Sequence, residues 1–512
     1  MRSLTPARTL VAAVLSVCVG ASIWVASGLR AQQRSPAQVR YKIAYATFLG
    51  GSAWDQAREV IPYPDGSTLV GAQTGSHDTP TTEGVVQPKY AGDDPNLGHG
   101  GVYGGDCYLA HVSADGKELL AATYFGGSKQ ERNTYGMGLD SQGNVVICSG
   151  TRSSDMPTTK GCFQAKYGGG ATDWFAAKLS ASLKQLLWCT YIGGSGDGMP
   201  RGGLAIDTDD SVYVVGTTAS PNFPTTPGVI QTRLNGQRDA AIAKLSPDGS
   251  KLVWATLLGG SGVDGTPMGV RLDSEGSVYG AGHTQSADFP VTAGAPQPRY
   301  GGKSDCFVVK LSVDASRLLH STYLGGSENE FAEHRPYLAQ DGSLLVPGVS
   351  ASPDFPTTPG AFQRRLNGRN DAFLVKLSPD GKRFVFSTLI GGSAGEFCLM
   401  PTPDAEGNIF IVGQTESRDL PVTTGALQES YGGGASDGWL AILSPDGSRM
   451  LYCTYLGGSG DDMVRSVALG PNGEVYLVGH TGSADFPVTA GAAQTKYRGK
   501  GDAYLVKLIP ER

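Results

Sequence analysis

Acidic side chains recur at one fixed place in the sequence, five residues after the first glycine of a repeated Gly-Gly-Ser triplet. The six acidic members of this set are Asp55, Glu131, Asp264, Glu330, Glu396 and Asp462, and the seventh place is held by Gly198. Carboxylates that gather in one place suit a cation that prefers oxygen ligands, such as Ca²⁺. The pattern therefore predicts a ligand-binding ring with Ca²⁺ as a possible ligand. The alternative is a set of solvated turns joined by weak ion pairs.

Two further groups of polar residues break the repeat and are candidates for asymmetric chemistry. Glu330 is followed closely by Glu333 and His334, and an insert in the first repeat begins with Asp93 and Asp94. Histidine and carboxylates can hold a metal or act as an acid–base pair, although a surface histidine beside acids is more often only solvated. We add Glu333 and His334 to the predicted ligand-binding set and assign no catalytic residue. The two groups belong to distant repeats, so the sequence does not predict that they converge.

Aromatic residues close to the same segments offer flat surfaces on which sugar rings can stack. Trp54 is one of them, and the others are the tyrosines Tyr90, Tyr167, Tyr300, Tyr431 and Tyr497. Because the five tyrosines recur at one place in the repeat, packing within the loop is the favoured interpretation for them.

The elements that must position these residues come from an internal repeat. Gly-Gly-Ser follows an apolar segment seven times, with first glycines at Gly50, Gly126, Gly193, Gly259, Gly325, Gly391 and Gly457. A proline, a threonine, a glutamine and an aspartate recur in the same register within each unit. We expect the threonine to cap a short helical turn, the glutamine to bond loop backbone, and the aspartate to hold the loop before a strand.

Each unit predicts four short strands separated by turn residues. In the fourth unit these are Met268–Leu272, Ser277–Ala281, Cys306–Leu311 and Leu318–Leu324. Four strands in each of seven units predict an all-β, seven-bladed β-propeller of four-stranded antiparallel blades over residues 41–512.

The two ends of the repeat region are complementary. Tyr41–Phe48 resembles a fourth strand without the first three, and Asp502–Leu508 resembles a third strand without a fourth. We therefore predict that the N-terminal strand completes blade 7 and closes the ring, which removes an open sheet edge. In such a ring the Gly-Gly-Ser loops and the long Asp-Phe-Pro-x-Thr loops share one face, which we expect to be the binding face.

The unit Tyr-Leu-Gly-Gly-Ser … Asp-Phe-Pro-x-Thr-x-Gly-Ala … Gly-Asp-Ala-Phe-x-x-Lys-Leu resembles the bacterial SBBP (seven-bladed beta-propeller) repeat family. The resemblance covers essentially residues 41–512. It implies an exported or cell-surface protein and no particular activity, because fold alone does not define function.

The N-terminus has the layout of a secretory signal, with Arg2 and Arg8 before an uncharged apolar stretch, Leu10–Leu29. We predict a signal peptide over 1–31 and a short linker over 32–40, and hence export to the periplasm, the cell surface or the medium. An uncleaved membrane anchor or a lipoprotein signal at Cys18 are the alternatives.

Composition limits the classes of partner. The formal net charge is −6, without the basic character of a nucleic-acid-binding domain. Seven cysteines lie beyond Cys18, an odd number without zinc-finger spacing. Several of them replace small residues of the repeat, so we expect buried fillers.

These observations favour an exported, non-catalytic binding or adhesion module. Its partner would be a polysaccharide or a surface protein, with no nucleic acid, and with a membrane only through an uncleaved N-terminal segment. The alternatives are an extracellular enzyme that acts on polysaccharide and a structural component of the cell envelope.

Overall fold

The computed structural model describes residues 40–92, 104–199, 201, 203–265, 269–332 and 335–511. The predicted signal peptide, all but the last residue of the linker, and Cys18 lie outside these residues. Val39–Arg512 form one unit by their internal contacts. Within the described part of the chain, no helix is long and apolar enough to cross a membrane.

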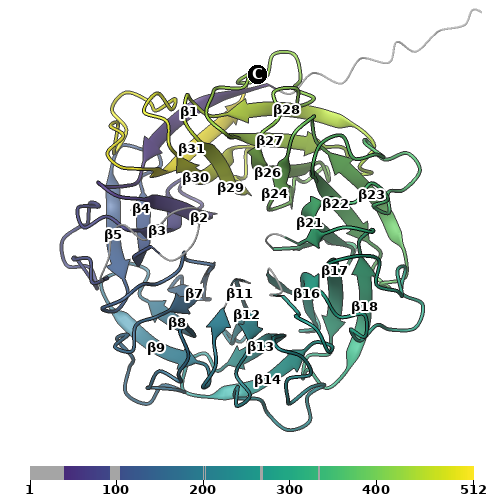
Figure 1. Cartoon of the computed structure of the whole chain (residues 1–512). Coiled ribbons are helices and arrows are strands. Elements are labelled where there is room, and N and C mark those ends of the chain that lie inside the picture. Colours follow the sequence, from purple (N-terminus) through teal and green to yellow (C-terminus); the bar gives the residue numbers. More distant parts are fainter. Residues whose placement is uncertain are drawn as a thin grey trace, which may run out of the picture. The chain divides into compact units, whose positions relative to one another are not determined.

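Seven antiparallel sheets are arranged as the blades of a propeller, one after another around a common centre (Figure 1). Each blade carries its first strand innermost and its fourth strand at the rim, so the prediction of an all-β, seven-bladed propeller is confirmed.

The innermost strands vary from two residues to eight, and those of blades 3, 5 and 6 are divided into two pieces. They are β2 (Asp55–Pro62), β6 (Gly136–Leu139), β10 (Gly198–Met199) with β11 (Leu204–Ile206), β15 (Val270–Leu272), β19 (Glu330–Phe331) with β20 (Tyr337–Leu338), β24 (Glu396–Cys398) with β25 (Thr402–Pro403), and β29 (Asp462–Leu469). The second strands are β3 (Thr68–Thr74), β7 (Val145–Thr151), β12 (Val212–Thr218), β16 (Val278–Thr284), β21 (Leu344–Ser350), β26 (Ile409–Thr415) and β30 (Val475–Thr481).

The third and fourth strands form the outer half of each blade. The third strands are β4 (Asp106–Val112), β8 (Asp173–Leu179), β13 (Asp239–Leu245), β17 (Asp305–Leu311), β22 (Asp371–Leu377), β27 (Asp437–Leu443) and β31 (Asp502–Pro510). The fourth strands are β5 (Leu119–Phe125), β9 (Leu186–Ile192), β14 (Leu252–Leu258), β18 (Leu318–Leu324), β23 (Phe384–Ile390), β28 (Met450–Leu456) and β1 (Tyr41–Phe48).

The third strands are apolar along nearly their whole length because neighbouring blades cover both of their faces. In β13 every residue is buried. One core cluster joins Leu374 of blade 5 to Ile411 and Trp439 of blade 6. A sheet buried on two faces needs apolar residues at consecutive positions, rather than the alternation of a one-sided sheet. The hydrophobic core is therefore distributed between the blades.

The seventh sheet combines the two ends of the repeat region. Its strand order is β1-β31-β30-β29, and the antiparallel pairing runs from Tyr41 opposite Pro510 to Phe48 opposite Tyr504. The N-terminal strand thus occupies the fourth place of the last blade. This pairing ties together segments more than 450 residues apart in the sequence, a contact of high sequence separation that is costly to form early in folding.

The repeated loop residues hold the blades in ways that were only partly predicted. The threonine does not cap a helix: Thr82 Oγ1 accepts a hydrogen bond of 3.0 Å from the amide of Ala122 in the fourth strand of its own blade. The aspartate does hold the loop before its strand, since Asp106 Oδ2 accepts from the amide of Ala91 at 2.9 Å. Six of the seven described cysteines are buried, in agreement with their expected role as fillers.

Candidate functional site

The structure places the six repeated acidic residues inside the protein, where each connects the Gly-Gly-Ser loop to the end of a second strand. Asp55 Oδ2 accepts hydrogen bonds from the amide of Gly51 at 2.7 Å and from Ser76 Oγ at 2.9 Å. Its Oδ1 accepts from the hydroxyl of Thr74. Both oxygens of this carboxylate therefore have donors within the repeat.

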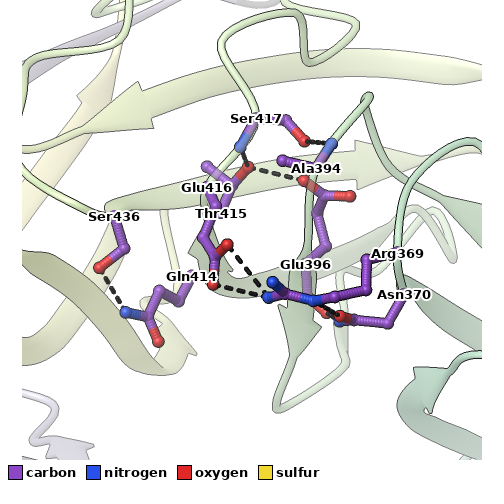
Figure 2. Close-up of polar contacts among 9 residues, drawn as sticks. All are labelled: Arg369, Asn370, Ala394, Glu396, Gln414, Thr415, Glu416, Ser417 and Ser436. Atoms are coloured by element: carbon purple, nitrogen blue, oxygen red, sulfur yellow. Dashed lines mark hydrogen bonds and ion pairs between the residues drawn. The ribbon is translucent and has the colours of Figure 1, made fainter.

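Glu396 shows the same arrangement at the entry to blade 6 (Figure 2). Its Oε1 accepts from Thr415 Oγ1 at 2.8 Å, and its Oε2 accepts from the amide of Gly392 at 3.1 Å. Its backbone carbonyl accepts from Asn370 Nδ2 at 2.8 Å. All six acidic side chains have an exposed fraction of 0%. These contacts give the carboxylates a structural function, and ligand binding by this set stays a prediction.

A second buried carboxylate stands next to each of these six acids, contributed by the first residue of a third strand. A Cβ on Gly50 would lie 2.7 Å from Asp55 Oδ2 and 3.0 Å from Asp502 Oδ1, and Gly126 stands in the same way between Glu131 and Asp106. The first glycine of the triplet is therefore required because any side chain would overlap two carboxyl groups. We call these sites the junction carboxylate pairs; each joins one blade to the next.

Burial dominates the electrostatics of the junction pairs. It raises the pKa of Asp55 to about 6 and that of Asp502 to about 7, where the neighbouring charge of Asp55 adds to the effect. Burial and the charge of Asp106 raise the pKa of Glu131 well above its ordinary value. Two close carboxyl groups in a low dielectric cannot both ionise cheaply, so the pairs favour holding a proton.

Blade 3 lacks the first member of the pair. Gly198 takes its place, and the indole ring of Trp174 lies beside it. A Cβ added to Gly198 would come within 2.9 Å of Trp174 Nε1. The remaining acid, Asp173, is still fully buried, and burial raises its pKa to about 6. An aromatic ring thus replaces a carboxylate at this one junction.

The polar candidate residues that break the repeat are not among those that the structure describes. Glu333, His334, Asp93 and Asp94 lie outside the described residues, so the predictions for them are untested. In the parts of the chain that the structure describes, no group of three or more His, Cys, Asp or Glu residues is arranged to hold a metal ion.

The five recurring tyrosines pack within the loops, as their recurrence predicted. Each stands edge-on against an aromatic ring of a fourth strand at 5.8–6.0 Å between ring centroids. The pairs are Tyr90–Tyr124, Tyr167–Tyr191, Tyr300–Tyr323, Tyr431–Tyr455 and Tyr497–Phe48.

A groove of about 530 Å³ opens where loops of blades 6, 7 and 1 meet. We call it the seam groove, because the ring closes at blade 7. Its lining consists of Trp54, Gln414, Glu416, Ala435, Ser436, Gly460, Asp461, His480, Gly482 and Lys500.

The walls of the seam groove are held by specific contacts. The ring of Trp54 packs on that of His480, with centroids 4.9 Å apart, and Trp54 forms a β-bridge with Gly501. Elsewhere in the lining, Gln414 donates to the hydroxyl of Ser436 (Figure 2).

Glu416 is oriented by Arg369, which lies in the loop between β21 and β22 of blade 5. Arg369 Nη2 donates to both carboxylate oxygens of Glu416, at 2.9 and 3.1 Å (Figure 2). On the blade 7 side, Asp461 Oδ1 accepts from the amide of Ala435 at 2.6 Å. The groove therefore presents one aromatic face and several fixed polar groups, a combination found in ligand pockets. Sequence reasoning found Trp54 but missed Gln414 and Lys500, because nothing in their local pattern marks them.

Comparison with protein families agrees with the repeat. Residues 187–224, from the fourth strand of blade 2 to the loop after the second strand of blade 3, match the family model described as SBBP, beta-propeller repeat. The chain carries the SBBP repeat. No curated protein sequence matches the chain.

Solved structures share the fold of this SBBP-repeat chain only distantly. A europium-containing methanol dehydrogenase is 11% identical, with coverage of 91% of this chain and 93% of that chain and a TM-score of 0.43. The quinohemoprotein alcohol dehydrogenase of Comamonas testosteroni is 12% identical, with coverage of 91% and 76% and a TM-score of 0.44. A protein of unknown function from Dyadobacter fermentans is also 12% identical, with coverage of 91% and 98% and a TM-score of 0.40. Likenesses at this level do not bear on the function of the SBBP-repeat chain.

Proposed function

We propose that the chain is an exported, non-catalytic binding propeller that holds a polysaccharide in the seam groove. The observation that carries this proposal is the partly exposed indole of Trp54 beside the fixed polar groups of Gln414, Glu416 and Asp461. An aromatic face packs against the C–H face of a sugar ring, while amide and carboxylate groups bond its hydroxyls.

The position of the groove supports the proposal. The aromatic residue is fixed by its packing on His480 and by the bridge to Gly501, and Glu416 forms an exposed ion pair with Arg369. A site whose side chains are already ordered loses little entropy when a ligand binds. The rigid ring thus acts as the scaffold for a preformed surface.

The non-catalytic part of the proposal rests on where the acids are. The acids of highest pKa form the junction pairs, and their side chains are fully buried. A general acid must come within hydrogen-bond reach of the substrate, which these groups do not. Export is proposed from the charged and apolar layout of residues 1–31.

The test is a titration of the purified chain with a panel of bacterial and plant polysaccharides, followed by tryptophan fluorescence and calorimetry. We expect saturable binding of at least one glycan and a loss of affinity on the order of tenfold or more in Trp54→Ala, the range for a buried aromatic contact. The matched control is Phe331→Ala, which removes an exposed aromatic ring of blade 5 outside the groove and should leave affinity unchanged.

The other outcomes separate the alternatives. Release of new reducing ends from a bound glycan would favour the enzyme. If no glycan binds, the polysaccharide proposal is wrong, and a surface protein or a structural envelope role becomes the better hypothesis. A parallel thermal scan with Ca²⁺ and with EDTA tests the predicted calcium ligand, which would raise the unfolding midpoint reversibly.

A further inference from the structure

Arginine side chains from five of the seven blades lie around the centre of the propeller. They come from the innermost segments of blades 1, 2, 3, 5 and 7, around the ring centre that β2, β11, β24 and β29 surround (Figure 1). The residues are Arg58, Arg132, Arg201, Arg335 and Arg465. We call them the channel arginines; they do not follow the seven-fold repeat, and the sequence analysis did not select them.

Arg335 brings the group together across the ring axis. Its Nη2 forms an ion pair with Oε2 of Glu59. Glu59 belongs to blade 1, and in a ring of seven no two blades are farther apart than blades 1 and 5. The same side chain lies against Gly203 of blade 3 and Gly269 of blade 4, since a Cβ on either glycine would meet it within 3.4 Å. A side chain that contacts blades on opposite sides lies near the axis.

The other four channel arginines surround Tyr135 of blade 2. The guanidinium carbon of Arg58 lies 4.5 Å from the centroid of its ring, and that of Arg132 lies 6.0 Å away. Burial raises the pKa of this phenol, but surrounding positive charges outweigh burial and lower the pKa to about 8. The charges belong to Arg201, Arg132, Arg58 and Arg465.

The channel arginines are close to one another and largely buried. They lie at the sixth, eighth or tenth residue after the first glycine of their repeats. Arg58, Arg132 and Arg335 are 3%, 7% and 9% exposed. Among the described residues, the Nε atom of Arg335 has no hydrogen-bond acceptor. Buried like charges gathered in one place repel one another, and an anion held between them relieves this repulsion.

We propose that the central channel binds a compact multivalent anion, one that bears phosphate or carboxylate groups, between the channel arginines. Guanidinium groups match such anions because their planar fork donates two parallel hydrogen bonds. The site is separate from the seam groove and does not depend on the proposed polysaccharide. A ligand with at least two negative charges can contact more than one channel arginine at once.

The experiment measures binding of inorganic phosphate and of citrate to the purified chain by calorimetry, with chloride at equal ionic strength as the reference. We expect saturable binding of at least one of the two, and the stronger of them identifies the phosphate or carboxylate class. Arg201→Gln and Arg465→Gln should each weaken the affinity by about tenfold or more, the usual loss for a charge-assisted hydrogen bond. Arg299→Gln, which changes an exposed arginine in a loop of blade 4, should bind like the unchanged chain.

A second readout does not depend on the variants being folded. The phenol of Tyr135 should ionise near pH 8 in an ultraviolet titration, well below ordinary tyrosines, and Tyr135→Phe should abolish this step. A bound anion offsets the arginine charges, so phosphate or citrate should raise the pKa of this step relative to chloride. No saturable binding beyond chloride, or a Tyr135 step that neither anion moves, overturns the proposal.

Discussion

The blade junctions and the central channel both bury charge, but they do so in opposite ways. At a junction, Glu396 and its equivalents receive hydrogen bonds from a glycine amide and from side-chain hydroxyl groups of the next second strand and loop. In the channel, Arg335 reaches from blade 5 to Glu59 of blade 1. The junction contacts are made again in blade after blade, whereas the channel contacts occur once.

This difference separates architecture from a candidate binding region. A residue that recurs in every blade has the same internal partners every time, and its chemistry is used to assemble the ring. A residue that breaks the repeat, such as Arg335 or Trp54, has partners that the repeat does not supply. If charge at the junctions serves to assemble the ring, changes there should alter the stability of the fold.

The largest expected effect is a dependence of stability on pH. Folding raises the pKa of junction acids from 3.8 to about 6 for Asp55, Asp305, Asp437 and Asp462 and to about 7 for Asp106 and Asp502. Between about pH 4 and pH 7 the folded state therefore binds more protons than the unfolded state, so the free energy of unfolding falls as pH rises through this window. One pKa unit corresponds to about 1.4 kcal/mol. Urea unfolding at pH 4, 5, 6 and 7 measures the trend, and a stability that rises with pH would contradict it.

The free energy of unfolding should also fall as the pH drops below about 4. Hydrogen bonds from serines in exposed turns lower the pKa of Asp248 and Asp446 to about 2. These groups contribute stability above pH 4 that is lost as pH falls toward 2. The two opposed trends place the stability maximum near pH 4.

The next largest effect is expected from Glu396→Ala. It leaves the hydroxyl of Thr415 and the amide of Gly392 without their acceptor in a buried place. Each buried donor left without a partner costs about 1–3 kcal/mol, so we expect the free energy of unfolding to fall by about 3–5 kcal/mol. Denaturant unfolding measures it. Glu275→Ala in an exposed turn is the control and should change little. Equal losses in the two variants would mean that burial of the junction acid does not determine its contribution to stability.

A smaller effect is expected from Gly126→Ala. The added Cβ would lie 2.2 Å from Glu131 Oε2 and 2.7 Å from Asp106 Oδ1, so one carboxyl group must move, at a cost of about 1–3 kcal/mol. The comparison variant is Gly161→Ala, where φ is +85° but nothing lies within 4 Å of the added Cβ; it should cost about 1–2 kcal/mol through backbone strain alone. Combining Gly126→Ala with Asp106→Ala should recover part of the loss.

The smallest effect is expected at the junction that lacks the pair. Asp173→Asn removes the acid of blade 3, which has Trp174 and Gly198 in place of a second carboxylate, and we expect a loss of about 1 kcal/mol or less. The same change in a complete pair, Asp106→Asn, should alter the slope of stability against pH much more. Equal slopes in the two variants would show that pairing does not control the proton.

Sequence reasoning predicted the strands well wherever the repeat was regular. The predicted Tyr41–Phe48 and Leu318–Leu324 have the observed bounds of β1 and β18. The predicted Ser277–Ala281 became Val278–Thr284, because its last threonine pairs with Asp305 at the start of the next strand. Innermost strands were harder to place, since their lengths range from two residues in β19 to eight in β2 and β29.

The candidate sites were predicted less well, for a physical reason. Sequence spacing identified the acids but not their surroundings, and the direction of a short strand's side chains decides whether a carboxylate faces solvent or hydroxyl donors. Trp54 was recognised by its type. Gln414 and Lys500, which share its groove, lie hundreds of residues away in the sequence and meet it only because the ring closes.

The sequence by itself determined the number of blades, the strand order and the places of glycine, proline and aspartate, because these follow from local turn chemistry repeated seven times. Only the tertiary structure decided which charges are buried together. Closing seven sheets into a ring brings residues such as Glu59 and Arg335 to one axis, and no local pattern records a contact between opposite blades.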